Sequence, residues 1–127
     1  MASIFSLTGC YQVQPASGSP SGDPIIDAPI DESLVLKAVQ VLTVTLDTDL
    51  PESLAFGDLA AAHVLVIRAT GGKVRLRATS TDGAAQAIPF DPLIILMSSA
   101  VPITAADLTR VAGSGTVTCK VLLGEKA

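Results

Sequence analysis

The sequence lacks most of the residues from which catalytic and metal sites are built. Its 127 positions include no tryptophan, one histidine, two cysteines and only 3% aromatic residues. Two cysteines with one histidine cannot form a structural zinc site without carboxylates, and a single histidine leaves few ways to build a catalytic triad. We therefore expect no enzymatic activity, no metal ion and no cofactor. The core must consist of Val, Leu, Ile and Ala, and the β-branched residues among these favour strands.

The chain also has no long apolar run and no net positive charge. The longest apolar stretch, around Leu93 to Met97, is far shorter than the roughly 20 residues that span a bilayer. The net charge of −4 opposes binding to phosphate backbones. These features predict neither a membrane nor a nucleic-acid partner. Only 16% of residues are charged and the mean hydropathy is +0.55, which predicts apolar surface for other chains to cover.

The N-terminal segment contains a Leu-Thr-Gly-Cys sequence that ends at Cys10 and resembles a lipoprotein cleavage box. No basic residue precedes this sequence, and the apolar region that a signal peptide needs is missing. We therefore expect no export signal and reduced thiols at Cys10 and Cys119. The Cys119 side chain is expected to pack as a small hydrophobe on one face of a strand, although a disulfide between the two residues remains an alternative.

Two parts of the chain differ in composition. Residues 1–32 are rich in Pro, Gly and Ser and show no sustained period, which predicts an extended N-terminal arm held by a neighbouring subunit or folded back on its own domain. Residues 33–127 show repeated alternation of apolar and polar residues separated by turn signals. This pattern predicts one all-β domain, an antiparallel β-sandwich of jelly-roll-like form with about seven strands.

The strands of this domain are expected where alternation is clearest. Leu34 to Leu46 predicts a long strand that ends at an Asp- and Pro-containing turn, and Leu93 to Ser98 predicts a buried strand. The residues after Asp58 suggest one short helical turn. The runs Val64–Thr70 and Lys73–Thr79, joined by two glycines, predict a tight hairpin.

Individual polar residues outside the hairpin favour structural interpretations. His63 is expected at the rim of the core rather than as a general base. Asp47, Asp49 and Glu52 have the alternating oxygen ligands that calcium accepts, but the calcium-loop pattern is missing, so a solvated turn is the favoured interpretation. The glycines at 71 and 72 followed by Lys73 lack the remaining positions of a phosphate loop.

The predicted hairpin would gather half of the eight Lys and Arg residues on one face, namely Arg68, Lys73, Arg75 and Arg77. Like charges opposed across a sheet are destabilising, so this group indicates an anionic partner, with a solvated outer face as the alternative. The arm carries the opposite charge, at Asp23, Asp27, Asp31 and Glu32. We therefore hypothesise an arm exchange between subunits, in which these carboxylates bind the basic face.

Three segments resemble a known group of proteins. They are His63–Gly72, Ile103–Arg110 and Val121–Glu125, which look like parts of the small β-sandwich decoration (cement) proteins of tailed-bacteriophage virions. The likeness covers the domain from about residue 33 onward, and its motifs have low specificity. It implies a capsid-bound structural protein in a phage particle assembled in a bacterial host. It also implies a homo-oligomer, for example a trimer, whose partners are the major capsid protein or other virion subunits.

Two other classes of function compete with this expectation. A head-to-tail connector, baseplate or fibre protein would need the same kind of arm. A carbohydrate- or protein-binding β-sandwich module is the second alternative, although carbohydrate sites usually present aromatic platforms, and the chain has only Phe5, Tyr11, Phe56 and Phe90.

Overall fold

The computed structural model describes residues 3–13, 26–111 and 115–127, with side chains for residues 3–8, 31–82, 87–111 and 115–127. The described chain is all-β, and it contains no helix long and apolar enough to span a membrane. Its strands are β1 (Ser3–Val13), β2 (Ile26–Leu46), β3 (Glu52–Ser53), β4 (Val64–Thr70), β5 (Val74–Ser80), β6 (Gly83–Phe90), β7 (Leu93–Met97), β8 (Ile103–Arg110) and β9 (Val117–Lys126).

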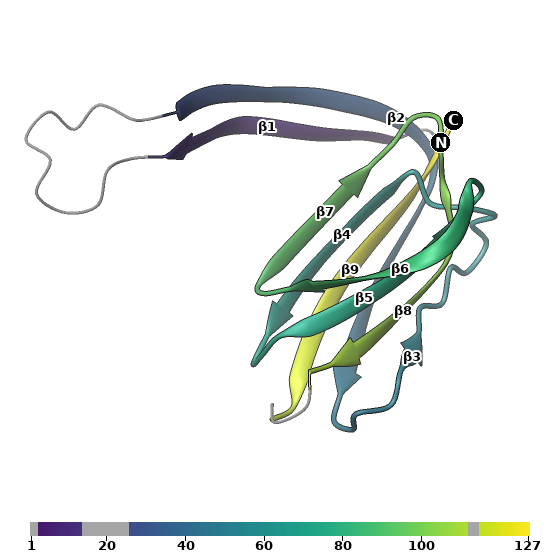
Figure 1. Cartoon of the computed structure of the whole chain (residues 1–127). Coiled ribbons are helices and arrows are strands. Elements are labelled where there is room, and N and C mark those ends of the chain that lie inside the picture. Colours follow the sequence, from purple (N-terminus) through teal and green to yellow (C-terminus); the bar gives the residue numbers. More distant parts are fainter. Residues whose placement is uncertain (1–2, 14–25, 112–114) are drawn as a thin grey trace, which may run out of the picture.

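The strands form two antiparallel sheets (Figure 1). The five-stranded sheet has the order β1-β2-β9-β4-β7, and the four-stranded sheet has the order β3-β8-β5-β6. Alternating apolar residues of both sheets meet in one core, because successive side chains of a strand point to opposite faces. The fully buried members include Leu65, Ile67, Cys119 and Leu123 from the first sheet and Leu76 and Leu108 from the second. The all-β, antiparallel prediction is therefore confirmed.

The predicted hairpin at Gly71 and Gly72 is wrong. Strand β4 pairs with β7 and β9, whereas β5 pairs with β6 and β8, so the glycines carry the chain from one sheet to the other. Gly71 has a φ of 107°, a backbone conformation that residues with a Cβ atom rarely adopt. The alternation of apolar and polar residues has the same period in a hairpin and in a crossing between sheets, so the pattern alone could not separate the two.

The connections at this end of the body are fastened to one another. Val111 donates its backbone N–H to Lys73 O at 3.0 Å, and Ala69 donates to Pro92 O at 2.7 Å. Arg110 Nε donates to Asp49 Oδ1 at 2.9 Å, and its Nη1 donates to Gly115 O at 3.0 Å. The turn that follows β2, the crossing after β4 and the connection after β8 therefore form one hydrogen-bonded cap.

Strand β2 belongs to two different structures along its length. Residues 26–36 pair with β1, and residues 36–46 pair with β9, with a register shift between Leu36 and Ala38. Lys37 lies at this irregularity, and its Nζ is 3.8 Å from Oε1 of the mostly buried Glu125. Figure 1 shows β1 and the first half of β2 leaving the two-sheet body together. We call these paired segments, residues 3–13 and 26–36, the ribbon.

The ribbon was not expected from the sequence. The Pro- and Gly-rich composition of residues 1–32 predicted no regular element, yet β1 and the start of β2 lie within this range. The long strand predicted from Leu34 to Leu46 is confirmed in its end at Leu46, but it begins at Ile26. Residues 14–25, which carry most of the Pro, Gly and Ser signals, lie outside the described residues.

Two smaller predictions are also corrected. The segment after Asp58 forms turns and an isolated bridge at Ala62 rather than a helical turn. Strand β7 is not a central buried strand, because it pairs only with β4 at the edge of the five-stranded sheet and Leu93 is 39% exposed. Its continuous apolar run reflects two apolar faces, one turned to the core and one turned outward.

Replacing Gly71 with Ala is expected to destabilise the fold. The new Cβ would lie 2.5 Å from the backbone oxygen of Thr116, in a strained backbone conformation that costs about 1–3 kcal/mol. Gly115→Ala is the matched control, since a Cβ there meets nothing within 4 Å. Urea denaturation gives the free energy of unfolding of both variants. Equal free energies of unfolding for the two would contradict the strained crossing.

Candidate functional site

The four cations predicted to share one face are divided between two sheets. Arg68 is exposed on β4, in the five-stranded sheet, whereas Arg75 and Arg77 are exposed on β5, in the four-stranded sheet. Lys73 lies in the connection between them. Because the core separates the outward faces of the two sheets, Arg68 cannot act together with Arg75 and Arg77 on one partner surface.

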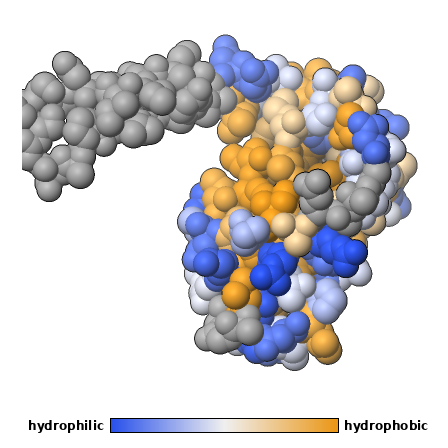
Figure 2. All heavy atoms as spheres, viewed as in Figure 1, coloured by the Kyte–Doolittle hydropathy of each residue, from blue (hydrophilic) through white to orange (hydrophobic). Residues whose placement is uncertain are grey.

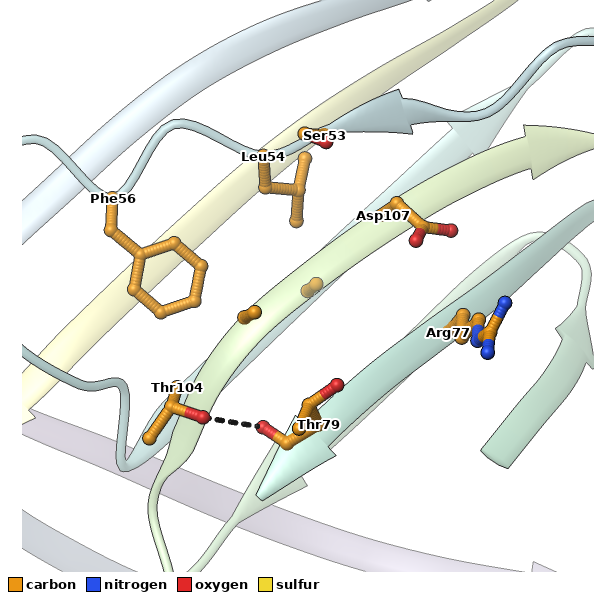
Figure 3. Close-up of a pocket in the computed structure, with 9 residues that line it drawn as sticks. Ser53, Leu54, Phe56, Arg77, Thr79, Thr104 and Asp107 are labelled. Atoms are coloured by element: carbon orange, nitrogen blue, oxygen red, sulfur yellow. Dashed lines mark hydrogen bonds between the residues drawn. The ribbon is translucent and has the colours of Figure 1, made fainter. Parts of the chain in front are cut away.

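The outward face of the four-stranded sheet carries a shallow hollow of about 430 Å³ (Figure 3). Asp107 on β8 lies directly opposite Arg77 on β5 and Ser53 on β3. Thr104 Oγ1 donates to Thr79 O at 3.3 Å along the same wall. The hollow therefore offers one carboxylate, one guanidinium and several hydroxyl groups, a set suited to hydrogen bonding with a polar partner.

His63 and Cys119 both have structural positions. His63 Nδ1 accepts a hydrogen bond from Lys126 N at 3.1 Å, and its backbone N–H donates to Gly124 O, so the residue fastens the start of β4 to β9. The Cys119 side chain is fully buried in the core, and this burial raises the pKa of its thiol. The predictions for His63 at the rim of the core and for Cys119 as a small core hydrophobe are confirmed. The side chain of Cys10 lies outside the described residues.

The acidic turn after β2 is tied to the neighbouring strand. Asp49 forms the ion pair with Arg110 described above, while Asp47 and Glu52 are exposed. The carboxylate considered as a calcium ligand thus serves to hold the turn against β8.

Part of the outward face of the five-stranded sheet is apolar. Val41, Leu122, Val66 and Ile95 lie directly opposite one another on β2, β9, β4 and β7 and form a row across four strands. Val41 is 69% exposed and the other three are half-buried. Val39 and Met97, which belong to the next row, extend the patch. We call this surface the apolar face.

The ribbon overhangs one end of the apolar face. Leu7 and Leu34 of the ribbon and Ile95 and Met97 of β7 line a hollow of about 480 Å³ between them. Leu36 at the ribbon base lies over Gly124, where an added Cβ would be 2.6 Å from Leu36 Cδ1. Figure 2 shows apolar side chains gathered on the body just below the base of the ribbon. Body and ribbon therefore form the two walls of a notch, whose lining also includes the polar residues Glu32, Ser33 and Ser99.

A pair of cations lies beside the apolar row. Arg68 on β4 and Lys120 on β9 are directly opposite each other, and both are exposed. Within the described part of the chain, no carboxylate lies within 4 Å of either side chain. Directly opposed like charges destabilise a sheet, so this basic pair favours an anionic partner. Lys120 was not among the residues predicted from the sequence, because only the pairing of β4 with β9 brings it opposite Arg68.

The acidic residues predicted in the arm are described in part. Asp31 and Glu32 are exposed on the ribbon, and as neighbours in a strand they point to its two opposite faces. Only the backbone of Asp27 is described, in β2, and Asp23 lies outside the described residues. Whether these acids bind a basic face of another subunit stays a prediction.

Comparison of the chain with protein-family models, with curated proteins and with solved structures found no match. The resemblance to phage decoration proteins therefore stays an expectation from the sequence.

The Cys119 thiol is expected to resist alkylation in the folded protein. Its burial excludes the reagent and keeps the thiol protonated, and the thiolate is the reactive form. In a Cys10→Ser chain treated with iodoacetamide at pH 8, modification should follow the urea unfolding curve. A native rate equal to that of free cysteine would contradict the buried position.

Proposed function

We propose that this chain is a non-catalytic structural subunit of a virus particle, and that its body is a jelly-roll β-sandwich. The strand order supports the jelly roll. Between β2 and β9 every connection passes from one sheet to the other, except the β5–β6 hairpin. The resulting strand orders are β2-β9-β4-β7 and β3-β8-β5-β6. Eight strands in two Greek keys take this arrangement, which viral capsid domains and lectins use. Because one fold hosts many functions, the assignment must rest on surfaces as well.

The apolar face is the observation that carries the proposal. It crosses four strands, two of which are edge strands of the body, and its row of Val and Leu side chains is open to partners. Contiguous apolar patches of this kind mark protein interaction sites. When a subunit binds through such a face, the apolar area that it buries stabilises the assembled state. Tighter binding to the shell stabilises that state more.

Within virus particles we propose the role of a decoration (cement) protein on a phage capsid. The resemblance of His63–Gly72, Ile103–Arg110 and Val121–Glu125 supports this role. Residues 1–32 would act as an arm in contact with neighbouring subunits, and the major capsid protein would be the receiving surface. The net charge of −4 suits a position outside the packaged DNA.

A connector, baseplate or fibre protein would use the same two surfaces, and its particles would show the chain at the tail rather than over the shell. For a carbohydrate-binding module, the described aromatic side chains give little support. Phe90 is buried and Phe5 is half-buried, while Phe56 lines the hollow in Figure 3. Binding in a glycan screen would favour that alternative.

Particles from cultures of the source organism are expected to contain this chain in stoichiometric amounts on their outer surface. Mass spectrometry and immunogold electron microscopy measure both properties. Particles stripped of the chain should rupture at a lower temperature, and adding the purified chain back should restore their stability. Absence of the chain from intact particles would contradict the proposal.

The variant Val41→Lys should fail in this add-back experiment, because it places a charge in the apolar face. Its folding should be little affected, by about 0.5 kcal/mol or less, since Val41 is 69% exposed. Ala87→Lys, on the exposed outward side of the four-stranded sheet, is the matched control and should restore stability as the unchanged protein does.

A further inference from the structure

We infer that the partner on the apolar face is the ribbon of a second copy of this chain. This inference rests on the proposed structural function and names one partner for its main surface. Four observations support it: beyond its base at Leu36, each strand of the ribbon is paired only with the other strand, the ribbon is long enough to cross the face, it carries an exposed apolar patch, and its charge is opposite to that of the basic pair.

The ribbon needs a surface to pack against. Among the described strands, β1 is hydrogen-bonded to β2 alone, and residues 26–35 of β2 are paired to β1 alone. An isolated two-stranded hairpin is marginally stable at best in water. Figure 1 shows the outer part of the ribbon extending beyond the body, whereas Leu7 and Leu34 nearer the base face β7 across the notch. The outer part of the ribbon therefore needs a surface outside its own body.

The dimensions of the ribbon and the face agree. The 11 residues of β1 span about 35 Å at roughly 3.3 Å per residue, while four neighbouring strands are about 14 Å apart from first to last. A ribbon from a second copy can therefore cross β2, β9, β4 and β7 completely.

The ribbon already shows how it packs on this face. At its base, Leu36 covers Gly124, and Val64, which is opposite Gly124 and on the outward side, is fully buried. The next row is covered less and unevenly: Ile95 faces Leu7 and Leu34 of the ribbon across the notch, while Val41 at the other end of the row is 69% exposed. On the side of the ribbon turned away from its own notch, Ile4 and Val35 lie directly opposite each other and are 69% and 48% exposed. They form a second apolar patch on the same chain.

Charge selects the ribbon as the occupant. The basic pair of Arg68 and Lys120 lies two residues along the strands from the apolar row. The ribbon carries Asp31 on one face and Glu32 on the other, so either face that it presents brings a carboxylate. A guanidinium or ammonium group that binds a carboxylate across an interface fixes the register of the two partners. Each copy supplies one ribbon and one face, so the two surfaces are present in equal numbers.

The test reverses charges on the face, on the ribbon or on both in the purified full-length chain. Sedimentation equilibrium then gives the dissociation constant of self-association for each variant. The unchanged chain should self-associate, and more weakly at high salt. Reversing the face (Arg68→Glu with Lys120→Glu) or the ribbon (Asp31→Lys with Glu32→Lys) should raise the dissociation constant about tenfold, because each places like charges at the contact. A chain that carries all four changes should regain the original affinity, and so should an equimolar mixture of the two reversed chains.

Arg75→Glu with Arg77→Glu is the matched control, since these residues lie on the other sheet and should leave self-association unchanged. Urea midpoints confirm that each variant folds. A chain that stays monomeric at millimolar concentration would overturn the inference. So would a chain with all four changes that associates as weakly as the two singly reversed chains. The proposed function is tested separately, by whether particles contain the chain. If the chain is monomeric but is present in particles, the function stands, and a different virion protein covers the apolar face.

Discussion

The insertion of β9 between β2 and β4 is the interaction on which the rest of the structure depends. This last strand pairs with β2 through Val117 to Lys126 and with β4 through Thr118 to Gly124. Its alternate residues Val117, Cys119, Val121 and Leu123 are almost fully buried in the core. Without β9, β2 and β4 would not be joined in one sheet, and the sheet that carries the apolar face would not exist. Pairing segments so far apart in sequence loses loop-closure entropy. The sheet can therefore be completed only when β9 has joined the other strands.

The same strand determines where the ribbon begins. Pairing with β9 ends at the irregularity beside Lys37, and from there β2 continues with β1 as its partner. Glu125, nearly buried at the end of β9, is compensated by the Lys37 ammonium group at this point. Gly124 leaves room for Leu36 to pack over the sheet, which a larger residue would prevent. The overhang of the ribbon is therefore a consequence of local packing at the end of β9, and it creates the notch at one end of the apolar face.

The sequence predicted the features that depend on local alternation of apolar and polar residues. It did not predict those that depend on which distant segments pair with each other. Strand positions from Val64 onward, the turn after Leu46 and the burial of Cys119 follow from the order of apolar and polar residues. The crossing at Gly71 could not be recognised, because a hairpin and a crossing share one period and differ only in which strands become neighbours. For the same reason Arg68 was grouped with Arg75 instead of Lys120. The ribbon was missed because the Pro, Gly and Ser residues at positions 14–25 dominate the composition of residues 1–32. Its two strands are formed by pairing with each other, which composition does not reveal.

The apolar face poses a problem that the charges on it help to solve. Exposed edge strands such as β2 and β7 tend to associate with any other strand, and apolar outward side chains increase this tendency. Opposed cations at Arg68 and Lys120 repel a second copy of the same face, so two bodies cannot pack face to face without bringing four positive charges together. A partner that carries carboxylates meets no such penalty. In the proposed self-association, the apolar row provides the area for binding, and the basic pair disfavours the symmetric contact and favours an acidic segment, of which each copy brings one in its ribbon.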